Sequence, residues 1–93
     1  MPVVLRVGPY RFLIYPGDEG EPAHVHVQRD RPRAKIWLRT PGTLDAVSVA
    51  EPGGFRAAEL RRVVRTVEAH RALLLSKWDR MFPDAGPDPA RPQ

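Results

Sequence analysis

The stretch "EPAHVHVQ", from Glu21 to Gln28, decides the fold because valines alternate in it with polar residues. In a β-strand, successive side chains point to opposite faces of the sheet. Val25 and Val27 therefore point to one face, and His24 and His26 point to the other. An apolar sheet face must be covered by another layer. The stretch thus predicts a two-sided sheet with one buried face and one polar face.

The segment from Arg33 to Arg39 alternates in the same way and predicts the partner strand of a hairpin. Its apolar side chains extend the buried face, and its polar side chains extend the other: Arg33, Lys35, Trp37 and Arg39. Antiparallel sheets commonly leave one face in water, so a solvated face is the simplest interpretation. A tryptophan on that face is less expected and favours a binding surface.

A first hairpin precedes this one, because "VVLRV" and "YRFLIY" flank Gly8-Pro9, which suits a type II′ turn. The turn predicts a register in which three apolar pairs face each other: Val7 with Tyr10, Leu5 with Phe12, and Val3 with Ile14. On the other side, Arg6 stands opposite Arg11. Like charges at that spacing repel unless an anion or a carboxylate lies between them, or unless both chains splay into water.

One long helix is predicted from Arg56 to Phe82, where apolar residues recur at steps of three and four. Arg71 falls inside this apolar stripe, so we expect a carboxylate to hold it, with Glu21 and Glu68 as candidates. A short fifth strand can form in "TLDAVSV". The predicted fold is α+β: an antiparallel sheet of four or five strands, built from two N-terminal hairpins and covered on one face by a long C-terminal helix.

Length and composition indicate one domain, because 93 residues leave no room for a second core. We assign residues 1–82 to this α+β domain and residues 83–93 to a disordered proline-rich tail. The chain has no cysteine, which suits the cytoplasm, and arginines interrupt the apolar N-terminus, so no membrane span is predicted. The net charge of +4 favours acidic partners such as RNA, DNA or an acidic protein.

Four ordered motifs make the chain resemble the bacterial family called domain of unknown function 4160. They are "P-x-V-x-R-x-G-x-Y-R-F" at residues 2–12, "E-P-x-H-V-H-V" at 21–27, "A-K-x-W-L" at 34–38, and a helix pattern over residues 54–82. Such proteins are often encoded beside a small partner, and the pairs look like toxin-antitoxin modules. The resemblance therefore implies a toxin component, with a cognate antitoxin as its protein partner.

The residues leave several hypotheses open. The first is a metal-independent endoribonuclease that would need a general base, a general acid and cations for the phosphate charge. The candidate catalytic residues are His24, His26 and Lys35, and the candidate binding residues are Arg6, Arg11, Trp37, Arg39 and Arg71. The second is a module without catalysis that binds an acidic protein or a nucleic acid through the same basic face, with Trp37 as an anchor.

Two further interpretations concern the histidines. A metal ion could lie between His24 and His26, but only Glu21 and His70 could complete such a site, so neither a metal nor another cofactor is predicted. Alternatively, the two histidines hydrogen-bond loop carbonyls and hold the turn at Glu21-Pro22. The sequence does not separate these interpretations, and it leaves the number of chains in the native assembly open.

Overall fold

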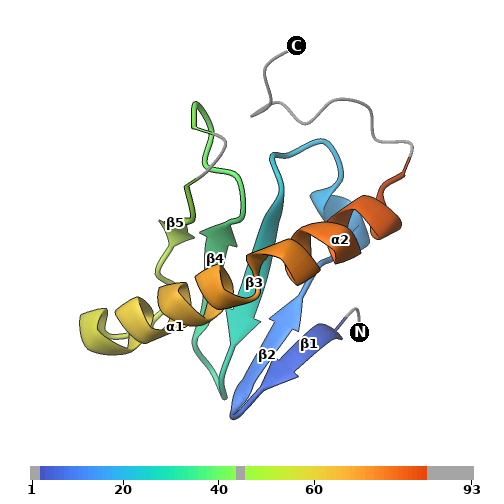
Figure 1. The fold of residues 1–93 in the computed structure, drawn as a ribbon. Helices are drawn as coiled ribbons and strands as arrows, with labels where there is room; N and C mark the ends of the chain where they lie inside the picture. The colour runs from blue at the N-terminus through green and yellow to red at the C-terminus, as the bar shows by residue number, and fades with distance from the viewer. Residues whose placement is uncertain (1–2, 44–45, 84–93) are drawn as a thin grey trace.

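The computed structural model describes residues 3–43 and 46–83, in which five antiparallel strands form one sheet and two helices cover one of its faces (Figure 1). The strands lie in chain order across the sheet. Their bounds are β1 Val3–Val7, β2 Tyr10–Leu13, β3 His24–Gln28, β4 Arg33–Trp37 and β5 Ser48–Glu51. The helices are α1 Ala57–Ala69 and α2 Arg71–Met81, and a short 3-10 helix, η1, spans Pro16–Asp18. The predicted α+β class is confirmed.

The first hairpin has the predicted turn, and Gly8 takes a positive φ of 54°. Two of the three predicted apolar pairs and the arginine pair are confirmed: Val7 with Tyr10, Leu5 with Phe12, and Arg6 with Arg11. The third pair was wrong, because Val3 pairs with Leu13 and not with Ile14. A register irregularity between Val3 and Leu5 explains the shift, since one extra residue in a strand moves every later pair by one.

The core lies between the sheet and the helices, as the alternation predicts. Val25, Val27 and Ile36 are fully buried, and so is Leu38 directly after β4. They pack in one cluster with residues of the helical layer: Phe55, Val63, Val67, Leu74, Trp78 and Phe82. Burying this apolar surface is the main force that holds the two layers together, at about 25 cal/mol per Å².

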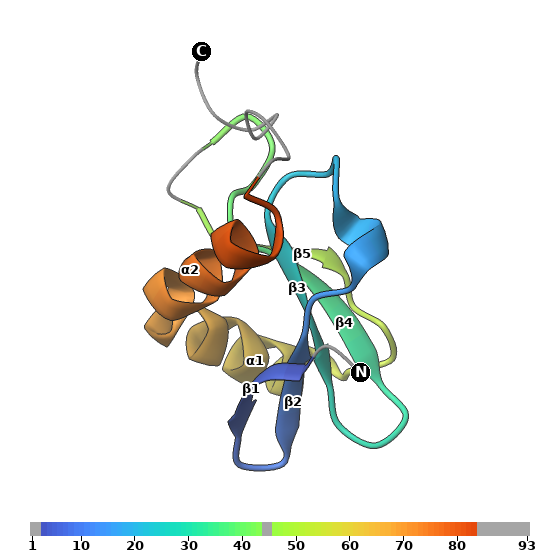
Figure 2. The same ribbon diagram turned by 90° about the vertical axis from the view of Figure 1, so that its right-hand side faces the viewer.

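The single long helix was wrong, because the segment forms two helices that meet at His70. His70 has φ −112° and ψ 15°, which is outside the helical range. Its ring Nδ1 donates a hydrogen bond to the carbonyl of Thr66 at 2.9 Å, in the last turn of α1. The helical hydrogen-bond pattern resumes in the first turn of α2, where the Leu74 amide donates to the His70 carbonyl. Both helices cover the same face of the sheet (Figures 1 and 2), and apolar residues of both belong to the core cluster.

The edges of the predicted elements shift slightly. β4 ends at Trp37, before the predicted Arg39, because the amides of Leu38 and Arg39 both donate to the Ala23 carbonyl and break the alternation. The fifth strand begins at Ser48. The predicted tail lies outside the described residues from position 84 onward. None of the described helices has the length and apolar character that crossing a membrane requires.

Candidate functional site

The polar face of the sheet brings the two histidines together with Lys35 and Trp37. Across β3 and β4, His24 is paired with Trp37 and His26 with Lys35. The rings of His24 and His26 lie 5.1 Å apart, and those of His24 and Trp37 lie 5.6 Å apart. The prediction that these four residues share one face is therefore confirmed. Their proposed chemical roles remain predictions.

The segment between β2 and β3 folds over this face, which the sequence did not predict. In Figure 2, η1 lies on the opposite side of the sheet from α1 and α2. Asp18, the last residue of η1, is only 7% exposed and reaches both histidines. Its Oδ1 lies 3.2 Å from His24 Nε2, and its Oδ2 lies 3.4 Å from His26 Nε2. The polar face therefore contains a buried Asp-His-His cluster.

His24 lies at the centre of this cluster and is fully buried. Its Nδ1 donates to the carbonyl of Pro22 at 2.9 Å, as expected if it holds the Glu21-Pro22 turn. Trp37 contacts the ring from the polar face, and Trp78 of α2 contacts it at 5.2 Å between ring centroids. A ring enclosed in this way cannot itself reach a large substrate. The geometry therefore favours a positioning or ligand role for His24.

His26 is more accessible, with 18% of its side chain exposed. Its ring packs edge-on against Tyr15 at 5.0 Å, and its Nε2 also lies 3.4 Å from Asp18 Oδ1. Burial lowers the pKa of His26, because desolvation disfavours the imidazolium and outweighs the opposing charge of Asp18. The lowered pKa favours the neutral imidazole over the imidazolium.

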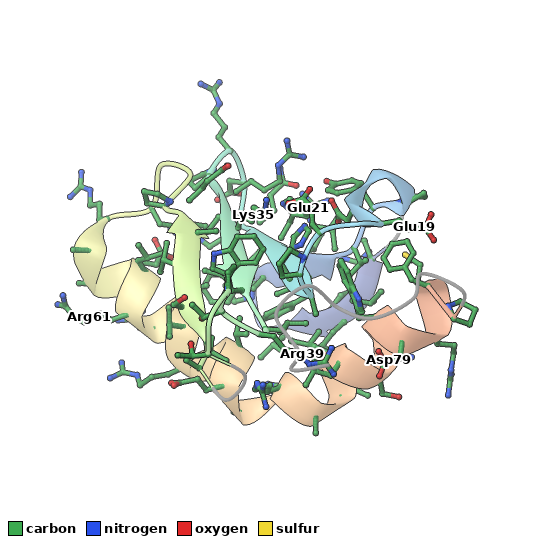
Figure 3. All side chains as sticks on the ribbon, turned by 90° about the horizontal axis from the view of Figure 1, so that it is seen from above. Glu19, Glu21, Lys35, Arg39, Arg61 and Asp79 are labelled. Atoms are coloured by element: carbon green, nitrogen blue, oxygen red, sulfur yellow. The ribbon has the colours of Figure 1, made fainter. Side chains whose placement is uncertain are left out.

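Lys35 is not a free cation. Its Nζ donates to Glu21 Oε1 at 2.6 Å and lies 4.8 Å from the centre of the Trp37 ring. Lys35 and Glu21 lie side by side in Figure 3. Because Glu21 balances the charge of Lys35, this lysine is less suited to phosphate than its sequence pattern suggests.

Arginines form a row across the same face. Arg6 pairs with Arg11 across β1 and β2, Arg11 pairs with Gln28 of β3, and Gln28 pairs with Arg33 of β4. Arg6 and Arg33 are exposed, and Arg11 is half-buried. Arg33 donates to the Tyr15 hydroxyl at 2.8 Å. Within residues 3–43 and 46–83, no carboxylate forms an ion pair with any of the three arginines.

Arg39 and Arg71 do not join this surface. Figure 3 places Arg39 on the side of α2, well apart from Lys35 and Glu21. Arg71 Nε donates to the Leu38 carbonyl at 2.8 Å, at the end of β4. The two other candidate metal ligands do not join His24 and His26, since Glu21 bonds Lys35 and His70 bonds the Thr66 carbonyl at the end of α1. The sequence analysis did not include Asp18 or Arg33 among the candidate site residues. Strand alternation did place Arg33 on the same face as Lys35, but no pattern in the sequence indicated Asp18.

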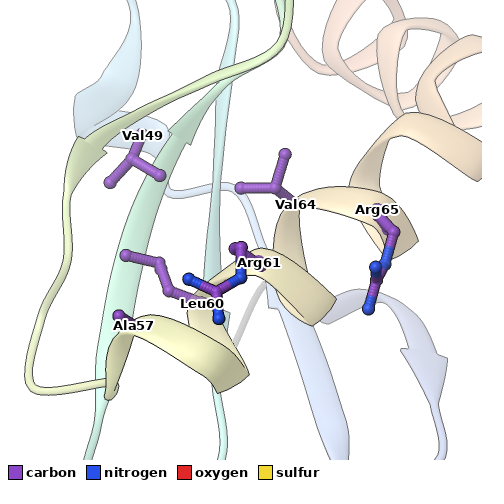
Figure 4. A pocket seen from close by; sticks show the side chains of 6 residues that line it. All are labelled: Val49, Ala57, Leu60, Arg61, Val64 and Arg65. Atoms are coloured by element: carbon purple, nitrogen blue, oxygen red, sulfur yellow. The ribbon is translucent and has the colours of Figure 1, made fainter.

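A second surface feature is a groove of ≈ 460 Å³ between β5 and α1 (Figure 4). Its lining is mainly apolar, with two arginines: Val49, Ala57, Leu60, Arg61, Val64 and Arg65. Val49 is 36% exposed and belongs to β5, an edge strand of the sheet. An edge strand presents backbone groups that another chain can pair with.

Comparison with known proteins places the chain in a family. No curated protein and no solved structure matches it. A family described as "Domain of unknown function (DUF4160)" matches residues 10–79, which include four of the five strands, α1 and most of α2. This span is well over half of the chain and contains the whole Asp-His-His cluster. The chain therefore belongs to the DUF4160 family.

Proposed function

We propose that this protein is the toxin component of a bacterial toxin-antitoxin module and that it binds RNA in the cytoplasm through the arginine row. The observation that carries RNA binding is the alignment of Arg6, Arg11 and Arg33 across four strands, with no ion pair to any carboxylate of the described residues. The toxin role rests on the resemblance to proteins that are encoded beside a small partner.

The arrangement of the arginine row suits a phosphate backbone. Adjacent strands lie about 4.8 Å apart. Arg6 and Arg11 stand on neighbouring strands, and Arg33 stands two strands beyond Arg11, with Gln28 between them. Each guanidinium can hold a phosphate with two parallel hydrogen bonds. A phosphate between Arg6 and Arg11 would also relieve the repulsion between two like charges that face each other. An anionic ligand thus accounts for a pair that is otherwise unfavourable.

The contacts favour binding over the predicted proton transfers. A general acid or base must lie within hydrogen-bond reach of the reacting group. His24 is buried under two tryptophans, and Lys35 is held by Glu21. The half-buried ring of Trp37 has Lys35 beside it, so it has less free area for stacking on a base than a bare ring would have.

The test is RNA binding as a function of salt. For single-stranded RNA, the slope of log affinity against log salt falls by about 0.7 for each phosphate contact that is lost. We expect Arg6→Ala, Arg11→Ala and Arg33→Ala each to reduce the slope of a labelled oligonucleotide by about that amount. Arg80→Ala is the matched control, because Arg80 is exposed on α2. An unchanged slope in the triple variant would refute the proposal.

The toxin role needs a separate experiment in cells. Induced expression of the chain should arrest growth, and co-expression of the adjacent reading frame should restore it. The triple arginine variant should not arrest growth if RNA is the target. RNA integrity in arrested cells then separates a protein that holds RNA from one that cleaves it, and arrest by the triple variant would contradict RNA as the target.

The groove beside β5 favours a second candidate function, the docking of an acidic protein. Its apolar floor suits apolar side chains, and Arg61 and Arg65 suit carboxylates beside them. We propose this groove as the place where the cognate antitoxin binds, through an acidic segment with apolar residues. Such a segment could also add a strand to the β5 edge.

The docking proposal is tested by reversing charge. The double variant Arg61→Glu, Arg65→Glu should weaken binding of the adjacent gene's product by more than tenfold, because two attractive pairs become repulsive. Arg62→Glu is the control, since Arg62 is exposed on the same helix but does not line the groove. Equal affinity in the double variant and the control would place the partner elsewhere.

A further inference from the structure

The Asp-His-His cluster has the donor set of a transition-metal site. Asp18, His24 and His26 each offer one ligand atom, and these atoms all lie within 4.8 Å of one another. Two imidazole nitrogens and one carboxylate oxygen are a common set for zinc and other first-row divalent ions. The three residues come from a span of nine positions, so the β3 strand and the loop before it build the whole cluster.

His24 supplies a second, independent observation. Its Nδ1 carries the proton that it donates to the Pro22 carbonyl, so in the neutral ring Nε2 holds a lone pair. This Nε2 is buried and has no hydrogen-bond partner among the described residues, although it lies only 3.2 Å from Asp18 Oδ1. Two electron-rich atoms at that distance repel each other. A cation between them would make the same contact favourable.

We propose that Asp18, His24 and His26 bind a divalent first-row transition metal ion of the zinc class. Around a tetrahedral ion with bonds of about 2.0–2.1 Å, neighbouring donor atoms stand about 3.3 Å apart. Asp18 oxygens lie 3.2 Å from His24 Nε2 and 3.4 Å from His26 Nε2. The two separations that involve Asp18 are therefore close to this value, and all three donors lie within 4.8 Å of one another.

The surroundings hold the donors in place. A metal-binding histidine usually donates its other ring N–H to a carbonyl or a carboxylate, and His24 does so to Pro22. The Tyr15 amide donates to Asp18 Oδ2 at 2.8 Å, which orients the carboxylate. Of the three donors, His26 has the most exposed side chain, at 18%. The fourth position thus opens toward His26 and would hold water or an anionic ligand.

The arginine row lies beside this position, since Gln28 of that row follows His26 by two residues on β3. Two residues of a strand span about 6.6 Å. A bound phosphate could therefore reach the metal. The metal site itself does not depend on RNA binding, and it is tested without RNA.

The test uses the full chain without an affinity tag, because a histidine tag would itself bind metal. The protein is stripped with a chelator and titrated with Zn²⁺ by calorimetry and with Co²⁺ by visible absorption. We expect one ion per chain, a cobalt spectrum of low coordination number, and a higher unfolding temperature with Zn²⁺. Mg²⁺ should give no binding, because it prefers oxygen ligands.

Variants assign the site. Asp18→Asn, His24→Gln and His26→Gln should each weaken Zn²⁺ binding by more than about 100-fold, which is the upper range for losing a supporting residue. Glu21→Gln and His70→Gln are the controls, since Glu21 lies in the same loop and His70 is the remaining histidine. Circular dichroism checks that each variant is folded.

Two results would overturn the proposal. One is a wild-type chain that binds Zn²⁺ no better than the folded Asp18→Asn and His26→Gln variants. The other is full binding in those two variants, with loss in the His70→Gln control. A chain that binds Zn²⁺ but fails the salt test would keep the metal site and refute RNA binding, so the two proposals can fail separately.

Discussion

Of the described glycines, Gly53 leaves the least room for a Cβ atom. It has a positive φ of 64°, and its carbonyl accepts the Arg33 amide at 3.0 Å. A Cβ there would overlap the carbonyl oxygen of Arg33, which is backbone and cannot move aside. This close contact joins the end of β5 to the start of β4.

Gly53→Ala should therefore lower the free energy of unfolding by clearly more than the about 1–2 kcal/mol that left-handed backbone alone costs. Gly42→Ala is the matched control, because Gly42 also has a positive φ, of 88°, and its Cβ would meet no atom within 4 Å. Urea unfolding of both variants measures the difference. Equal losses would show that the overlap is relieved at no cost.

Tyr10 carries a prediction about pH. Its hydroxyl donates to Glu59 Oε2 at 2.9 Å, and Glu59 also pairs with Arg29. Burial, and then the hydrogen bond to Glu59, raise the pKa of Tyr10 above its ordinary 10.0. The folded state therefore holds the phenol proton more tightly than the unfolded state. This contribution is complete below pH 10 and is lost as the pH rises through the folded pKa.

Unfolding by urea at several pH values from 8 upward tests this. The wild type should lose stability above about pH 10 more steeply than Tyr10→Phe, which has no phenol to titrate. At pH 8 the variant should be less stable by about 1 kcal/mol, the usual value of one hydrogen bond. If the free energy of unfolding fell with pH equally in the wild type and in Tyr10→Phe, the raised pKa of Tyr10 would be contradicted.

At the residue scale, strand alternation predicted the neighbours of the histidines but not Asp18. The positions of Lys35 and Trp37 follow from parity, because they stand opposite His26 and His24 in adjacent strands. Asp18 ends η1, in the connection between β2 and β3, where no sequence repeat predicts which way a side chain points. The segment "PGDEGEP" offers three carboxylates, and only the path of the chain selects one.

At the scale of elements, α2 depends on a contact with the end of β4. Arg71 Nε donates to the Leu38 carbonyl, one residue beyond the end of β4 at Trp37. We expect Arg71→Ala to cost about 1.5–3 kcal/mol, the range for a hydrogen bond to a charged group. Arg80→Ala, an exposed change on the same helix, should stay within about 0.5 kcal/mol. Thermal unfolding of both variants measures the difference. Equal losses of stability in the two variants would show that the Arg71 contact does not stabilise the fold.

The helical layer also shows where sequence periodicity stops being informative. The apolar residues Val67, Leu74 and Trp78 keep helical spacing across the break, so the pattern itself predicts one helix. At the break, the Thr66 carbonyl accepts both the His70 ring Nδ1 and the His70 amide. Histidine in a helix is ordinary, so nothing in the sequence marks this turn as different.

At the scale of the whole molecule, Trp78 links the core to the candidate metal site. It is 5% exposed, and its ring contacts Phe82 at 4.7 Å within the helical layer. The same ring contacts His24, whose imidazole belongs to the polar-face cluster. The sequence predicted that Trp78 faces the sheet. It could not predict the contact with His24, because alternation assigns the two residues to opposite sides.

Trp78→Ala should therefore have two effects. It should lower the free energy of unfolding by about 3–5 kcal/mol, as expected when a buried tryptophan is truncated. It should also weaken Zn²⁺ binding, because His24 loses one of the rings that fix it. Trp37→Ala is the comparison, since Trp37 also contacts His24 but is half-exposed and lies outside the core cluster.

Urea unfolding and zinc titration of the two variants separate these effects. Trp37→Ala should cost clearly less stability than Trp78→Ala, because it removes less buried surface. If Trp78→Ala is too unstable to titrate, Trp78→Phe keeps an aromatic ring and tests the contact with His24 alone. A Trp78→Ala protein as stable as Trp37→Ala would mean that the two layers of this fold do not depend on the ring that joins them.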